Sequence, residues 1–228
     1  MQATRYAIYY LPPKDSPLAA FGSGWLGYDI ESGGAVAQPD LPGIDLPAMT
    51  EEPRRYGFHA TLKAPFALAD GATEADLLAA ATRFAARTRP AAGPELVLAA
   101  IAGFLALVPD GPASDIARLA EDSVRGFDPL RRPPEPAELA KRAAAGLNPR
   151  QAAHLARWGY PYVLEEFRFH MTLTRRLAPT ERPAVEGQLA ARAAKVTGAP
   201  LVIADIALCR QEPGAAFTLW RRVSLAGA

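Results

Sequence analysis

The chain has 228 residues, of which 50% are hydrophobic and 21% are charged, and its formal net charge is +1. This balance is typical of a globular protein and argues against a broad basic surface for nucleic acid. The single cysteine, Cys209, excludes an internal disulfide and fits a reducing compartment. No apolar run approaches the ~20 residues of a membrane-spanning helix, and the first residues lack a secretion signal, so we expect a cytoplasmic protein.

The first half of the chain predicts strands separated by one long helix. Prolines at 39, 42 and 47 favour an irregular, exposed loop over residues 38–48. Alternating or continuous apolar patterns predict strands over 5–11, 55–64, 95–101 and 104–108. An alanine-rich helix is expected between the second and third of these strands, over residues 73–88.

The second half predicts a helical region followed by a strand–helix–strand order. Helices are expected over 114–125, 137–145 and 149–158, the last with Asn148 as its N-cap and Pro149 at its first position. A strand over 167–174, a helix over 181–196 and strands over 201–208 and 217–225 complete the chain.

Two of the three histidines lie in a repeated tetrapeptide. His59-Ala60-Thr61-Leu62 returns as His170-Met171-Thr172-Leu173, and a helix and apolar strands follow each copy. Strict alternation places polar side chains on one face of each strand: Arg55, His59, Thr61 and Lys63 in the first copy, and Arg168, His170, Thr172 and Thr174 in the second. The same alternation turns Tyr56 toward the core. An imidazole that moves protons, beside hydroxyl and cationic groups that hold oxygens, suits a phosphate.

Structural interpretations compete with the functional ones. A lone histidine in a strand is commonly structural, threonine favours strands in any case, and Lys63 and Arg168 could be solvated strand residues. Matching positions favour function for the histidine pair, because two core histidines have no reason to share a threonine two residues on. The third histidine, His154, lies in a helical stretch without a motif, so we expect it to be a surface or packing residue.

The paired His-x-Thr-Leu strands resemble the two-histidine (2H) phosphoesterase superfamily. Arg-Tyr-Gly-Phe-His-Ala-Thr-Leu-Lys at 55–63 and Phe-Arg-Phe-His-Met-Thr-Leu-Thr at 167–174 are similar to its branch associated with phosphonate-utilisation operons. The resemblance covers nearly the whole chain. It implies a bilobal, duplicated α+β fold with two antiparallel sheets, outer helices and a central cleft, related by pseudo-twofold symmetry, and metal-independent phosphodiester chemistry.

We therefore expect one bilobal domain over 1–228. The first histidine lobe would cover about 50–110, a helical insertion that shapes substrate choice about 112–161, and the second histidine lobe about 162–228. His59 and His170 are the expected catalytic pair, with Thr61, Thr172, Lys63 and Arg168 as phosphate ligands, and the sequence leaves open which histidine is the base. No cofactor or metal is expected, because neither motif contains a carboxylate and a catalytic zinc site normally needs three protein ligands.

The expected reaction is hydrolysis of a cyclic or small phosphodiester, with a phosphorylated ribose intermediate of phosphonate metabolism as the favoured substrate. One alternative is an RNA-end enzyme, a 2′,3′-cyclic phosphodiesterase or a 2′–5′ ligase-like protein, but the near-zero net charge counts against a long basic cleft. The other is a non-catalytic protein that binds a phosphorylated ligand, which would not need two proton-transfer groups. The expected partner is a small phosphorylated substrate; nucleic acid is not favoured, no membrane is expected, and no protein partner can be inferred.

Overall fold

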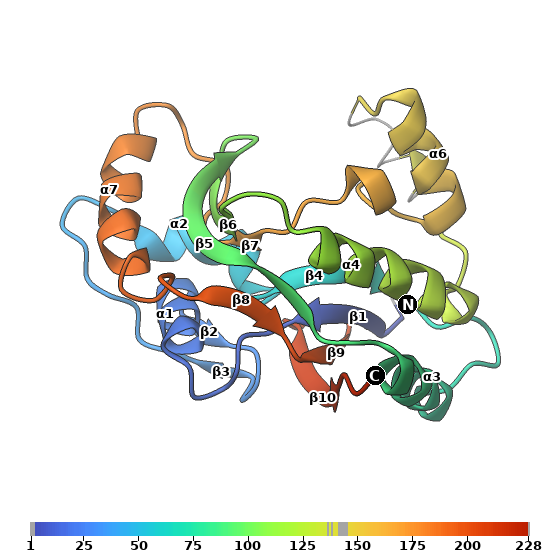
Figure 1. The fold of residues 1–228 in the computed structure, drawn as a ribbon. Helices are drawn as coiled ribbons and strands as arrows, with labels where there is room; N and C mark the ends of the chain where they lie inside the picture. The colour runs from blue at the N-terminus through green and yellow to red at the C-terminus, as the bar shows by residue number, and fades with distance from the viewer. Residues whose placement is uncertain (1–2, 136, 138, 141–145, 228) are drawn as a thin grey trace.

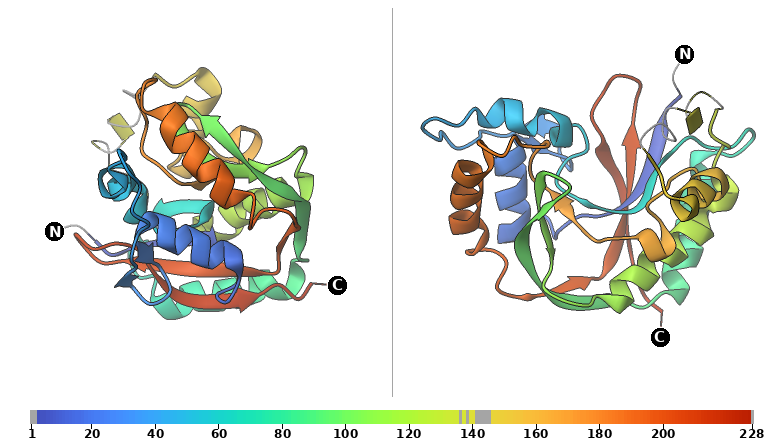
Figure 2. Two further views of the ribbon diagram at one scale, coloured as in Figure 1. Left: turned by 90° about the vertical axis from the view of Figure 1, so that its left-hand side faces the viewer. Right: turned by 90° about the horizontal axis from the view of Figure 1, so that it is seen from above.

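The computed structural model describes residues 3–135, 137, 139–140 and 146–227. Eight strands form one strongly curled sheet in the order β10-β9-β1-β4-β7-β6-β5-β8, in which every neighbouring pair is antiparallel (Figures 1 and 2). Two short strands, β2 (Tyr28–Asp29) and β3 (Gly34–Ala35), form a second sheet. The predicted α+β class with antiparallel sheets is confirmed, although one large continuous sheet takes most of the strands.

The two strands that carry the repeated tetrapeptides are neighbours at the centre of the large sheet, with three strands on either side. Its strands are β1 (Arg5–Tyr10), β4 (Ala60–Phe66), β5 (Ala91–Ile101), β6 (Phe104–Pro109), β7 (Met171–Thr172), β8 (Pro200–Ile203), β9 (Asp205–Gln211) and β10 (Thr218–Ser224). The connections cross the centre: β5 and β6 follow the first motif but pair on the side of β7, whereas β9 and β10 follow the second motif but pair on the side of β4.

Helices cover the sheet in two groups. The helices are α1 (Pro17–Leu26), α2 (Leu46–Arg54), α3 (Glu74–Arg87), α4 (Ser114–Phe127), α6 (Pro149–Trp158) and α7 (Arg182–Ala193), with 3₁₀ turns η1 (Asp128–Leu130) and η2 (Leu164–Glu166). Helices α1, α2 and α7 lie on one side of the molecule, and α3, α4 and α6 lie on the opposite side (Figures 1 and 2). Among the described residues, no helix combines the length and apolar character needed to cross a bilayer.

Local sequence signals account for the ends of the best-predicted helices. Thr73 and Asp76 form a capping box at the start of α3, where each side chain bonds the backbone N–H of the other residue. Asn148 and Gln151 form the same box at the start of α6, which ends at Gly159 in the left-handed conformation. The expected helix over 137–145 falls largely on residues outside the described part of the chain.

Several elements of the structure differ from the sequence prediction. The single strand expected over 201–208 is two strands, β8 and β9, because the chain leaves one half of the sheet at Ala204 and enters the other. Helix α2, which follows the N-cap Asp45, was not predicted, and its first residues, 46–48, fall in the stretch that was expected to be an irregular, exposed loop. It runs to Arg54 and is followed by Gly57 at φ +70°, so the strand expected from residue 55 begins only at Ala60.

Helix α4, which lies within the expected insertion over about 112–161, packs into the core of the fold. Its apolar face, which includes Ile116, Leu119, Val124 and Phe127, is buried, and the helix packs against β4 and β5. The segment of the expected 112–161 insertion that reaches the cavity described below lies nearer its end, at residues 147 and 160–161. The described helix in that part of the chain is α6, which stands beside the end of α4 (Figure 1).

The structure makes a stability prediction for Thr174. This residue is almost fully buried, and its hydroxyl accepts a hydrogen bond of 3.0 Å from the backbone N–H of Leu105 on β6. We expect Thr174→Val to lower the free energy of unfolding by about 1–3 kcal/mol, because it leaves a buried N–H without a partner. Urea denaturation measures this, with the exposed Thr82→Val as control, expected within about 0.5 kcal/mol of the wild type. Equal stability of both variants would contradict this role for Thr174.

Candidate active site

The pairing of β4 with β7 brings the two motifs together. Ala60 lies opposite Met171, and both side chains are buried in the main core. Counting one residue outward in either direction sets His59 opposite Thr172 and Thr61 opposite His170, all on the other face of the sheet. Directly opposed Cβ atoms lie about 4.5–5.5 Å apart and diagonal ones about 7–8 Å, so two imidazoles in this arrangement can flank one phosphate.

That face is the floor of a cavity of about 360 Å³. All four motif residues line it, together with residues from β1, the turn before β4, β4 itself and the segments on either side of α6: Arg5, Tyr9, Tyr56, Ala64, Pro65, Leu147, Tyr160, Pro161 and Tyr162. The volume lies in the range that small-molecule ligands occupy.

The environment of His59 fixes its tautomer and keeps it neutral. Its Nδ1 lies 2.9 Å from the carbonyl oxygen of Gly57, which can only accept, so Nδ1 carries the hydrogen. Its Nε2 lies 3.1 Å from Oγ1 of Thr61, whose hydroxyl donates to the ring nitrogen. The ring stacks on Tyr9 with centroids 3.9 Å apart. Burial lowers the pKa of His59 to about 4, a shift that the Gly57 bond opposes and the nearby His170 reinforces.

His170 is held in the same way. Its Nδ1 lies 2.8 Å from the carbonyl oxygen of Arg168, again two residues earlier in the chain. With Nδ1 bonded to a carbonyl, Nε2 is the ring nitrogen left for proton transfer. Each motif therefore orients its imidazole through the backbone two residues upstream, a feature common to both copies that the sequence alone did not reveal. The ring of His170 contacts Phe104, with centroids 5.7 Å apart.

Lys63 does not reach this cavity, contrary to the alternation expected from sequence. Between β1 and β4 the register shifts, so that Tyr9 pairs with Thr61 but the next residue on β1, Ile8, pairs with Lys63. Two residues of β4 thus oppose one of β1, a bulge that redirects the side chain of Lys63. Its ammonium donates to the carbonyl of Val124 at 3.0 Å.

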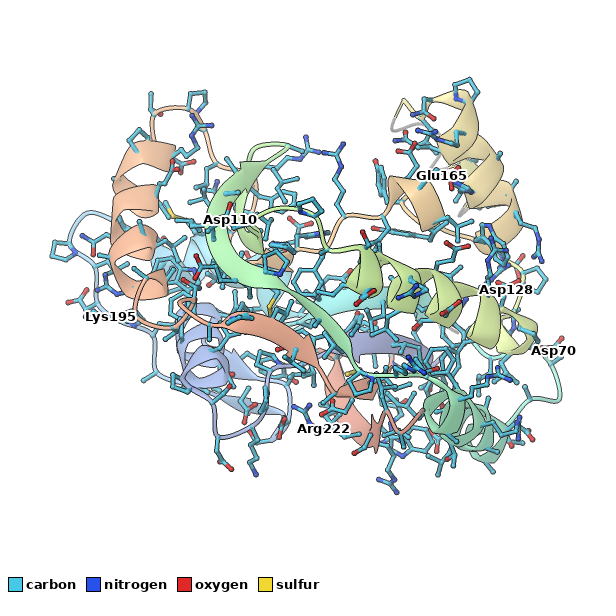
Figure 3. All side chains as sticks on the ribbon, viewed as in Figure 1. Asp70, Asp110, Asp128, Glu165, Lys195 and Arg222 are labelled. Atoms are coloured by element: carbon cyan, nitrogen blue, oxygen red, sulfur yellow. The ribbon has the colours of Figure 1, made fainter. Side chains whose placement is uncertain are left out.

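The buried ammonium of Lys63 has a structural role. It lies 3.6 Å from a carboxylate oxygen of Asp128, which also pairs with Arg131 and Arg157 and stands at the end of α4 (Figure 3). Burial lowers the pKa of Lys63 to about 8, although Asp128 acts in the opposite direction. Lys63 thus links β4 to the end of helix α4.

The flanking residues of the second motif also differ from the expected face. Regular strand structure covers only Met171 and Thr172, so alternation does not extend from 167 to 174. Arg168 is exposed and contributes its carbonyl to His170, but its side chain does not line the cavity. Thr174 is buried against β6. Of the six expected site residues, the structure gathers His59, His170, Thr61 and Thr172 and leaves the two cations elsewhere.

Several cavity residues were not predicted from the sequence, and two of them, Tyr56 and Tyr9, contact aromatic rings of the site. Tyr56, expected in the core, lines the cavity and stacks on Phe217 with centroids 5.7 Å apart, because the positive φ of Gly57 ends the alternation. Tyr9 lies on a correctly predicted strand, but only the pairing of β1 with β4 shows that it underlies His59. His154 packs in α6 with Nε2 3.2 Å from a carboxylate oxygen of Glu165 (labelled in Figure 3), away from the site as expected.

In the described residues, no group of three or more His, Cys, Asp or Glu side chains is arranged to hold a metal ion. The side chains that line the cavity include two imidazoles, two threonine hydroxyls, one guanidinium and four tyrosines.

The low pKa of His59 is testable. Burial against the Tyr9 ring disfavours the charged form of His59, so removing that ring should raise the pKa of His59. NMR titration of the ring protons should give an apparent pKa of about 4 in the wild type. We expect Tyr9→Leu to raise it toward the ordinary value of about 6.5. Tyr9→Phe is the control, because it keeps the ring and should leave the pKa unchanged. An ordinary value in the wild type would refute the role of burial.

Two curated relatives align with almost the whole chain. It is 46% identical over 235 residues to a protein of Janthinobacterium sp. (strain Marseille) and 40% identical over 223 residues to one of Laribacter hongkongensis (strain HLHK9), both named ribose 1,5-bisphosphate phosphokinase PhnN. The alignments cover 98% and 97% of this chain but 51% and 52% of those proteins. The chain thus spans about half the length of the curated relatives it matches.

Among solved structures, the chain is similar to E. coli LigT, crystallised with 3′-AMP, with a TM-score of 0.46 and 14% identity over 98% of this chain and 99% of the other. A likeness this distant carries no argument about activity. Residues 61–218 match the family described as "Protein of unknown function (DUF1045)", a span that includes Thr61, His170 and Thr172. Because that match covers more than half of the chain, the protein belongs to the DUF1045 family.

Proposed function

We propose that this protein is a phosphodiesterase of the two-histidine type, which hydrolyses a small cyclic phosphodiester without a metal ion. The observation that carries the proposal is the arrangement of the two motifs. Two imidazoles, each oriented by a carbonyl two residues upstream, line one cavity with a threonine hydroxyl across the strand pair from each. A pair of proton-transfer groups in one cavity, beside two hydroxyl donors, suits a phosphate undergoing displacement.

The different surroundings of the histidines support the roles that we propose for them. His59 is neutral because burial lowers its pKa, so its Nε2 lone pair can accept a proton and His59 is the base. In the resting structure the Thr61 hydroxyl donates to that nitrogen. We infer that a bound substrate releases the hydroxyl, which then turns to a phosphate oxygen while a water molecule takes its place at Nε2.

The proton and bond changes then balance. His59 takes a proton from water as the water oxygen bonds to phosphorus, and a protonated His170 gives a proton to the departing ester oxygen as the phosphorus–oxygen bond breaks. The product is a phosphomonoester with a free hydroxyl, and proton exchange with solvent restores both rings. Thr61 and Thr172 donate to the non-bridging oxygens, where negative charge grows in the transition state.

The names of the two curated relatives support a proposal for the substrate class. Proteins about twice the length of this chain, which it matches over roughly half of their sequence, are named as kinases of ribose 1,5-bisphosphate. This chain has no Gly-x-x-x-x-Gly-Lys phosphate loop. We propose that the segment shared with those proteins acts on a related compound, a cyclic diester of a phosphorylated ribose from phosphonate metabolism.

An RNA-end or nucleotide substrate is the second candidate, and the aromatic lining favours it. Tyr56, Tyr160 and Tyr162 line the cavity, and tyrosine rings stack on nucleobases. Comparing a ribose cyclic phosphate with nucleoside 2′,3′-cyclic phosphates and with oligonucleotides that end in one separates the candidates by kcat/KM.

The histidine pair makes the first functional prediction. His59→Ala and His170→Ala should each lower kcat/KM by about 10²-fold or more, and the double variant should lose much less than the product of the two losses. His154→Ala, which removes the histidine outside the motifs, is the matched control and should keep the wild-type rate. Full activity in either motif variant would reject the mechanism.

The pH profile follows from the direction of the pKa shift of His59. A base must be neutral, so kcat/KM should rise as the pH rises through about 4, where His59 loses its proton. It should fall again at higher pH, when the acid histidine deprotonates, and both apparent values belong to the coupled pair. A flat profile between pH 3 and 9 would contradict the assignment of the two roles.

Metal independence makes a separate prediction. Activity on a cyclic phosphodiester should survive dialysis against excess chelator, since the proton transfers are assigned to imidazoles. Loss of activity that one divalent ion restores would point to metal-activated water instead.

A further inference from the structure

A cation without a carboxylate partner lines the wall of the cavity. Arg5 lies there with Tyr9 and both histidines. Its Nε donates to Oε1 of Gln211 at 2.9 Å, and its Nη2 donates to the same oxygen. Within the described parts of the chain, no Asp or Glu oxygen lies within 4.0 Å of the guanidinium. A partly buried positive charge held by a neutral amide remains available to an anion.

The guanidinium is oriented before any ligand arrives. Gln211 is buried, and its amide nitrogen donates to the carbonyl of Ala215 at 2.8 Å, which turns its oxygen toward Arg5. Phe217 lies beneath the guanidinium, with 5.7 Å between Cζ and the ring centroid. Gln211 occupies one edge of the fork, and an arginine has five N–H donors, so donors remain for another acceptor. This positions Arg5 as a preorganised binding group.

A second donor beside Arg5 also lacks an acceptor. Tyr9 is fully buried, and its hydroxyl has no hydrogen-bond partner among the described residues. Burial raises the pKa of Tyr9 well above its usual value. The rings of Tyr9 and Phe217 lie with their centroids 5.7 Å apart, and Phe217 also lies beneath the Arg5 guanidinium, so Tyr9 and Arg5 contact the same ring. Tyr9 is therefore a neutral donor at the Arg5 end of the cavity. Buried hydroxyls are normally paired, so an unpaired one at a cavity points to an absent ligand.

We propose that Arg5 and Tyr9 form a second anion subsite, which binds a phosphomonoester group on the same small molecule whose cyclic diester is cleaved at His59 and His170. The inference rests on the proposed function and narrows it to substrates that carry two phosphorus groups. The Tyr9 ring stacks directly on His59, so the subsite adjoins the reacting centre. One sugar could therefore span both positions.

The test uses two ribose cyclic phosphodiesters that differ only in a phosphate ester on the C5 hydroxyl. We expect the wild type to prefer the C5-phosphorylated compound, and Arg5→Met to raise its KM by about 10- to 100-fold while the compound without the C5 phosphate is unaffected. Tyr9→Phe, which keeps the ring beneath His59, should raise the same KM by about 10-fold. Arg192→Met, on α7 and outside the cavity lining, is the matched control and should change neither KM value.

The outcomes separate this inference from the proposed function. Equal effects of Arg5→Met on both compounds would assign Arg5 to the reacting phosphate and overturn the second subsite, while the hydrolase assignment stands. Absence of turnover with either compound would reject the proposed function instead. Binding to the His59→Ala/His170→Ala variant then tests the subsite alone, because the C5-phosphorylated compound should bind more tightly, and Arg5→Met should remove that preference. No preference there would also overturn the subsite.

Discussion

The pairing of Ala60 with Met171 is the contact on which the rest of the site depends. It sets each histidine opposite the threonine of the other motif, and it does so because apolar side chains at 60, 62, 171 and 173 are buried on one face of the sheet. A slip of one residue along either strand would turn that motif's imidazole into the core and expose its apolar partners. The geometry of the two imidazoles is thus specified by hydrophobic burial on the face that carries no chemistry.

The crossed connections explain why this central pair stays together. Strands β5 and β6 follow the first motif but lie in the half of the sheet that contains the second, and β9 and β10 follow the second motif but lie in the half that contains the first. Neither half is therefore built from one repeat. The helices cross as well: α3 follows the first motif and packs against β10, while α7 follows the second and packs against β5. Regular pairing of β7 covers only two residues, and side chains reinforce its continuation. The indole N–H of Trp25 donates to the carbonyl of Leu173 at 2.9 Å, and Thr174 accepts from Leu105.

Sequence patterns predicted the features that the local sequence determines, such as helix caps and apolar strands. They failed where the direction of a side chain depends on how its strand pairs with a neighbouring strand. The caps at Thr73 and Asn148 and the apolar runs of β1, β5 and β6 are local, and the corresponding elements were predicted. Each histidine and the threonine two residues after it lie on the same face of their strand, and this short alternation holds in both copies. Lys63 lies beyond a bulge, which depends on how β1 pairs with β4 and leaves no signal in the sequence of β4 itself. The place of Tyr9 and Arg5 beside the histidines depends on the same long-range pairing.

Packing outside the motifs makes the duplicated histidines unequal. Both rings are oriented by the carbonyl two residues upstream, but His59 lies on the buried ring of Tyr9 at 3.9 Å, whereas His170 has Phe104 at 5.7 Å as its ring neighbour. Burial lowers the pKa of His59 and so disfavours its charged form, and the stacked Tyr9 ring, from β1, covers one face of this imidazole. A base and an acid need different proton affinities, and two identical motifs cannot supply that difference by themselves. In the proposed mechanism, the N-terminal strand therefore provides the asymmetry through Tyr9, and Arg5 on the same strand adds the charge that would select the substrate.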